Sequence, residues 1–170
     1  SSTSITMLLG DCLATTVMVK RKFSKEKFKI YHPGGNIGGS LLLAKDIMIT
    51  GKKLPLIKVN SKLSEGLKTM NKKNFGIIVA VKGKYIKGLV TDGDLRREIK
   101  FISKDTRIQK IMTKKPLFVN ENMPASKALS IMNEKKITSL LVVSDNDFKK
   151  KNKKLIGIIH IHSLLNYGLK

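Results

Sequence analysis

The stretch Gly88-Leu89-Val90-Thr91-Asp92-Gly93-Asp94 decides how this chain folds. Its apolar part predicts a strand, and the charged residues that begin at Asp94 predict a short helix. A glycine inside a strand allows a ligand or another backbone to come close. The stretch therefore predicts a strand that passes into a helix, with polar side chains at the junction.

The residues before this junction complete a small unit. A helix opened by Ser64-Glu65 carries apolar residues at helical spacing. The continuous run Ile77-Ile78-Val79-Ala80-Val81 predicts a strand that is buried on both faces. The expected order is β-α-β-β-α, with elements at 54–59, 63–70, 77–81, 85–90 and 94–99.

The same order occurs again in the second half of the chain. Asp46-Ile47-Met48 is matched by Lys110-Ile111-Met112, and Ser139-Leu140-Leu141-Val142-Val143 is a second continuous apolar run. One such unit cannot bury both faces of its short sheet, so two units must pack together. We therefore expect an α/β (α+β) fold of tandem repeats at 46–105 and 106–170, packed as a pseudo-twofold pair.

Two side chains at the strand–helix junction have chemistry that suits a ligand. The Thr91 hydroxyl can donate to a phosphate, and the Asp94 carboxylate can accept from the vicinal hydroxyls of a ribose. Both lie near one helix N-terminus, where an anion is favoured. Asp94 is equally suited to capping its own helix, so the spacing alone leaves both interpretations open.

The second half departs from this pattern in Gly157-Ile158-Ile159-His160-Ile161-His162-Ser163. His160 stands where Thr91 does, and Ser163 replaces the carboxylate of Asp94. His160 could contact a phosphate. The two histidines have no cysteine and no third ligand beside them, so we expect a structural or surface role and no metal.

Residues 1–45 lie outside the repeats. A helix is expected from Thr6 to Val19, followed by basic residues that complement its dipole. The later segment His32-Pro33-Gly34-Gly35-Asn36-Ile37-Gly38-Gly39-Ser40 predicts a loop with special backbone angles. His32 is either an acid/base group beside that loop or an ordinary loop histidine, and no Gly-Lys-Ser/Thr ending makes the loop a P-loop.

The charge of the chain is strongly positive, with 34 Lys and Arg against 12 Asp and Glu. Lysines predominate and are spread over both halves, and aromatic residues do not interleave with them as single-strand binders require. Arginines that could read bases are nearly absent. The composition therefore makes nucleic acid an unexpected partner, although the charge would attract anionic metabolites.

The single cysteine and the lengths of the apolar runs indicate the cellular compartment of the protein. Cys12 is the one cysteine, which excludes an internal disulfide, and its apolar surroundings predict a buried, inert thiol. No signal peptide is recognisable, and no apolar run approaches the ~20 residues of a membrane span. We expect a cytoplasmic protein with no membrane partner.

The repeated β-α-β-β-α order, with the ending Gly88 to Asp94, resembles the CBS domain pair. This resemblance implies that Thr91 and Asp94 contact the phosphate and ribose of a nucleotide, with Gly88 and His160 as further ligand-binding residues. The altered second half implies at most one site of the usual kind.

A second resemblance involves residues 1–45. The segments Ser1-Ser2-Thr3-Ser4, Gly10-Asp11-Cys12-Leu13-Ala14 and the loop after His32 look like the end of a sugar-phosphate isomerase (SIS) domain. Followed by a CBS pair, they are similar to the arabinose-5-phosphate isomerases. Asn36 and Gly39 depart from the Ala and Arg often seen in that loop of the family, which puts the detailed contacts of the loop in doubt.

The second resemblance implies a regulatory module of an enzyme that interconverts D-arabinose 5-phosphate and D-ribulose 5-phosphate and supplies the Kdo precursor of lipopolysaccharide. His32 would be catalytic in the parent enzyme. No cofactor is required, the effector would be a nucleotide or a CMP-sugar, and the assembly would be a homodimer or tetramer.

This chain alone is expected to be inactive, because an SIS domain needs far more than ~45 residues. Two alternatives remain open: a stand-alone module for adenine nucleotides, and a purely structural dimerisation domain.

Overall fold

The computed structural model describes residues 1–24, 27, 42–98 and 103–169 and contains two three-stranded sheets. The first sheet has the order β1-β2-β3, in which β1 is parallel and β3 antiparallel to β2. The second sheet, β4-β5-β6, repeats this arrangement. His32 and its glycine-rich loop lie outside the described residues.

The first half follows the predicted order. Its elements are β1 (Leu56–Lys58), α5 (Leu63–Lys73), β2 (Ile77–Lys82), β3 (Tyr85–Thr91) and α6 (Asp92–Glu98), preceded by a 3-10 turn, η1 (Gly51–Lys53). The run Ile77 to Ala80 is buried throughout, as expected for a strand covered on both faces.

The second half repeats the order with one addition. Its elements are β4 (Phe118–Asn120), α8 (Ala125–Lys135), β5 (Ser139–Val143), α9 (Asp145–Phe148), β6 (Leu155–His160) and α10 (Ile161–Asn166). Residues 144–154, which connect β5 to β6, contain the short helix α9. The first half has only a tight turn at this place, with Gly83 at φ +61°.

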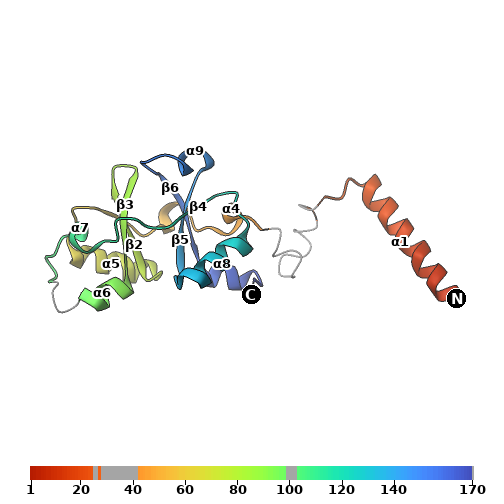
Figure 1. The fold of residues 1–170 in the computed structure, drawn as a ribbon, viewed down its shortest axis with the longest axis horizontal. Coiled ribbons are helices and arrows are strands. Elements are labelled where there is room, and N and C mark those ends of the chain that lie inside the picture. The colour runs from red at the N-terminus through yellow and green to blue at the C-terminus, as the bar shows by residue number, and fades with distance from the viewer. Residues whose placement is uncertain (25–26, 28–41, 99–102, 170) are drawn as a thin grey trace.

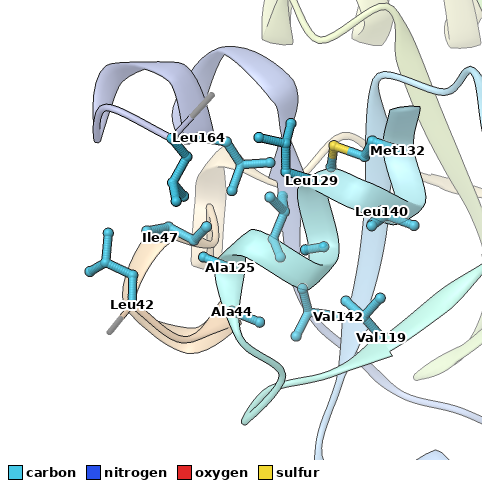
Figure 2. Close-up of a cluster of buried hydrophobic side chains, with 13 residues drawn as sticks. Leu42, Ala44, Ile47, Val119, Ala125, Leu129, Met132, Leu140, Val142 and Leu164 are labelled. Atoms are coloured by element: carbon cyan, nitrogen blue, oxygen red, sulfur yellow. The ribbon is translucent and has the colours of Figure 1, made fainter. Parts of the chain in front are cut away.

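Short leading helices cross between the two halves. α4 (Ala44–Ile47) precedes the first half, yet Ala44 and Ile47 pack with Ala125 and Leu129 of the second half (Figure 2). α7 (Ile108–Ile111) precedes the second half, yet the fully buried Ile108 belongs to the core of the first. Each half is therefore completed by a segment of the other.

A third cluster joins the two sheets. Ile77, Val79 and Ile86 of the first half pack with Leu141 and Ile158 of the second. The cluster is wholly aliphatic at its centre, so shape and apolar burial hold the sheets together. The predicted pairing of the two repeats is confirmed; the exact repeat boundaries stay a prediction.

α1 (Ser2–Lys20) contains the predicted helix and extends it toward the N-terminus. None of its residues is buried, and Cys12 is exposed. The expectation of a buried thiol was therefore wrong for this chain, because no described surface covers the helix. By length and composition α1 is apolar enough to cross a membrane, so the expectation that no apolar run approaches a span was wrong on that criterion. One such helix near the N-terminus is weak evidence for a span.

Gly88 and Gly157 lie at equivalent places on β3 and β6, where a leading segment of the chain approaches the strand. A Cβ at Gly88 would lie 2.6 Å from the Thr113 carbonyl oxygen and 2.9 Å from Met112 Sδ. A Cβ at Gly157 would lie 2.8 Å from Met48 Cγ. These positions need glycine because the space is already filled.

Gly88→Ala is expected to destabilise the pair by about 1–3 kcal/mol, because the new methyl group meets backbone that cannot move aside. Gly66→Ala is the matched control. Its Cβ would meet the Cδ1 ends of the Ile78, Ile108 and Ile57 side chains and no backbone atom, so a smaller loss is expected. Urea unfolding followed by circular dichroism measures both, and equal losses would contradict the argument.

Candidate functional site

The junction of β3 and α6 is held by reciprocal hydrogen bonds between Thr91 and Asp94. The Thr91 backbone N–H and hydroxyl both donate to Asp94 Oδ2, each at 2.9 Å. The Asp94 backbone N–H donates to Thr91 Oγ1 at 3.1 Å. The structure thus shows the capping role that the sequence left open, with Thr91 before the first residue of α6 and Asp94 in its first turn.

Arg97 completes this cluster by donating to Asp94 Oδ1. The Asp94 side chain is only 13% exposed, whereas that of Arg97 is 71% exposed. The Arg97 end of this ion pair is open to solvent, so a ligand can approach the pair from that side. Reaching the Asp94 carboxylate directly would require this arginine to move.

Gly88 lies on the same strand, paired with Ala80 of β2. Its open face is covered by Thr113 and Met112, so the close approach that glycine permits is made by the chain itself. No ligand contact at Gly88 is needed to explain the residue, and its ligand-binding role stays a prediction.

The second half places His160 at the position equivalent to Thr91. Ile77 is the β-sheet partner of Thr91, and Ser139 is the partner of His160. His160 precedes α10 and its Nδ1 accepts from the His162 backbone N–H at 3.3 Å. The Ser139 hydroxyl oxygen is buried and has no hydrogen-bond partner among the described residues.

His160 also lies where the two halves meet. Its ring centroid is 6.0 Å from that of Phe75, which precedes β2, and 5.1 Å from that of His162. Burial lowers the pKa of His160 below its ordinary value of 6.5, and the neighbouring charge of His162 lowers it further. The neutral imidazole is therefore favoured, which suits it as a hydrogen-bonding group more than as a fixed cation.

An apolar hollow beside α6 was missed by the sequence analysis. It has a volume of about 440 Å³ and is lined by Leu63, Leu67 and Leu95, with Asp92, Arg96, Ser103 and Lys104 at its edge. Leu67 and Leu95 lie on α5 and α6 and are only partly buried, which the sequence does not show. Over the described part of the chain, no group of three or more His, Cys, Asp or Glu side chains could hold a metal ion.

Comparison with known proteins identifies the two halves. The CBS domain pattern matches residues 44–101 and 108–170. The chain is 40% identical over 169 residues to an uncharacterised protein of Rickettsia prowazekii and 36% identical over 173 residues to the arabinose 5-phosphate isomerase KdsD of Escherichia coli K12. Each comparison covers 99% of this chain and 51% of the relative, so the chain spans about half the length of these relatives.

Solved structures agree on the fold. The crystal structure of CBSX2 in complex with AMP superposes with a TM-score of 0.62, at 21% identity, and covers 75% of this chain and 96% of that one. At this identity the likeness concerns the arrangement of helices and strands alone.

Thr91→Ala is expected to lower the free energy of unfolding by about 1 kcal/mol, because it removes an N-cap hydroxyl. Thr91→Ser keeps that hydroxyl and should recover most of the loss. Ser163→Ala is the matched control, since its hydroxyl makes no hydrogen bond with any described residue. Thermal unfolding of the three variants tests this; a Ser163→Ala loss as large as that of Thr91→Ala would contradict it.

The lowered pKa of His160 predicts that the free energy of unfolding of the two packed repeats falls in acid. Above the unfolded-state pKa of about 6.5 the imidazole is neutral in both states. As the pH falls below that value, the unfolded state takes up a proton while the folded state, with its lower pKa, stays neutral, so stability is lost. His160→Thr should flatten the stability profile just below pH 6.5. An unchanged slope in urea unfolding at several pH values would refute this.

Proposed function

Because the chain belongs to the CBS domain family, we propose that it is the nucleotide-sensing part of an arabinose 5-phosphate isomerase. The observation that carries the proposal is the match over 99% of the chain to isomerases of Escherichia coli and Yersinia pestis, at 36% and 35% identity. A match that extends through residues 1–45, outside the CBS repeats, supports descent from the same two-part arrangement.

The proposed ligand is a nucleotide or a nucleotide-sugar such as a CMP-sugar, held at the junction of β3 and α6. Thr91 would turn its hydroxyl from Asp94 to a phosphate oxygen, and Asp94 would accept from ribose hydroxyls once Arg97 has moved. The freed guanidinium could then pair with the phosphate. The AMP complex of a structure with the same fold supports this class of ligand.

Binding would control the enzyme only if the ligand prefers one of two states of the pair. The junction can report such a change, because the Asp92 backbone N–H is bonded to the Gly76 carbonyl at 3.0 Å and Phe75 contacts His160. A shift of α6 would therefore reach the contact between the two halves.

The proposal extends to the parent enzyme. It would interconvert D-arabinose 5-phosphate and D-ribulose 5-phosphate for the Kdo precursor of lipopolysaccharide, in the cytoplasm and as a homodimer or tetramer. His32 would act there in the acid/base step, which needs a group that exchanges a proton near neutral pH. The 170-residue chain by itself should show no isomerisation.

Thermal unfolding with AMP, ATP and a CMP-sugar tests the sensing role. A specific ligand should raise the midpoint of the pair, since it binds the folded state alone. Asp94→Asn should abolish that rise while keeping a side-chain acceptor near Thr91, and Ser163→Ala should leave it unchanged.

The same ligand should change the isomerase rate of the parent enzyme, and Asp94→Asn should remove the change without altering the rate in its absence. No rise in the midpoint with any of the three ligands, together with a stable dimer, would refute sensing and favour a structural dimerisation domain. A rise with adenine nucleotides and no effect on the isomerase would favour a stand-alone module.

A further inference from the structure

The connection between β5 and β6 forms a basic pocket at the end of the sheets opposite α6. In Figure 1 the β2–β3 turn and α9 lie together at one end, and α6 and α8 at the other. The pocket has a volume of about 420 Å³ and is lined by Lys84, Tyr85, Asp147, Lys150, Lys151, Asn152 and Lys154. β3 runs from Tyr85 beside this pocket to Thr91 at the junction of β3 and α6, so roughly 20 Å separates the two places.

Hydrogen bonds from both halves fix the walls of this pocket. The Ile86 backbone N–H donates to the Lys153 carbonyl at 3.0 Å, and Tyr85 forms a β-bridge with Lys154. Lys153 Nζ donates to the Lys150 carbonyl at 2.7 Å and lies 5.6 Å from the centre of the Phe118 ring. Lys153 therefore serves the fold of the connection, and the remaining lysines line the hollow with exposed side chains.

The pocket carries an excess of positive charge. Four lysines line it, and Asp147 is the one carboxylate among its lining residues. Asp147 is bonded to Lys150 at 2.8 Å, which raises the pKa of Lys150 and keeps it charged. Lys84 and Lys151 have no carboxylate partner among the residues that the structure describes. Like charges held together in a hollow repel each other and attract an anion.

We propose that this pocket binds a small organic phosphate with at least two negative charges. Each lysine offers up to three N–H donors, which match the oxygens of a phosphate group. The volume lies within the range of about 300–1,000 Å³ that organic ligands occupy and exceeds what an inorganic ion needs. Tyr85 is 48% exposed and offers a flat face and a hydroxyl to the organic part.

The alternative of nucleic acid fits these observations less well. A single strand requires a track of cations with several aromatic rings along it. Among the lining residues Tyr85 is the one aromatic side chain, and the lysines surround one hollow. A small phosphate is the ligand whose size and charge match.

Calorimetric titration of the full chain with pyrophosphate tests the site, with Lys84→Ala/Lys151→Ala as the probe variant. The expected result is saturable binding to one site that this pair of substitutions weakens by about tenfold or more. Lys68→Ala/Lys72→Ala is the matched control, because it removes the same charge from exposed positions of α5 and should change the affinity by less than about twofold.

Ribose 5-phosphate and AMP, titrated in the same way, distinguish a sugar phosphate from a nucleotide as the source of the phosphate. Equal weakening by the two double variants would overturn the proposal, since general attraction by the net charge would then explain the binding. Absence of saturable binding would overturn it as well. So would a single-stranded oligonucleotide that binds more tightly than any small phosphate and loses its affinity in Lys84→Ala/Lys151→Ala.

Discussion

The exchange of leading segments between the two halves is the constraint on which the rest of the structure depends. Ile49, just after α4, exchanges backbone hydrogen bonds with Ile158 of β6 at 2.8 and 3.0 Å. Thr113, just after α7, does the same with Leu89 of β3 at 2.8 and 3.1 Å. Neither half has a complete core without the segment that the other supplies, so the pair is the unit that folds. The exchanged segments pass directly over Gly88 and Gly157, where a larger residue would not fit.

This exchange positions the candidate ligand site. The bond between Leu89 and Thr113 lies two residues before Thr91, and the Asp92 N–H is bonded to the Gly76 carbonyl. The backbone of the junction is therefore fixed by the core. Among the described residues, the side chains of Thr91, Asp94 and Arg97 bond only within this cluster. A ligand at this place would compete with local side-chain bonds and leave the core intact. A fixed frame with adjustable side chains is the arrangement that pre-organised binding needs.

The strands and helices of both repeats could be predicted because buried strands leave continuous apolar runs such as Ile77 to Val81. The exchange could not be predicted, because Asp46-Ile47-Met48 and Lys110-Ile111-Met112 show where each repeat begins and not which sheet they pack against. α9 was missed because charged residues surround it. Cys12 was misjudged because an apolar sequence does not say which surface covers it. At the junction, the spacing from Thr91 to Asp94 serves a helix cap and a ribose site equally well, so geometry shows the cap and only a binding measurement can show the ligand.

The two halves share a backbone and differ in side chains at both ends of their sheets. His160 and Ser163 stand where the other half has Thr91 and Asp94, and the connection 144–154 replaces a tight turn. The exchange of leading segments is compatible with these differences. It is made by backbone hydrogen bonds and apolar contacts, which do not depend on the residues at the sheet ends. One half can therefore keep the threonine and carboxylate suited to a ribose phosphate. At the opposite end of the sheets, lysines of the 144–154 connection and Lys84 of the first half line a separate hollow. Duplication of the fold supplies two repeats with the same backbone, and the few residues at the ends of each sheet determine what that repeat can bind.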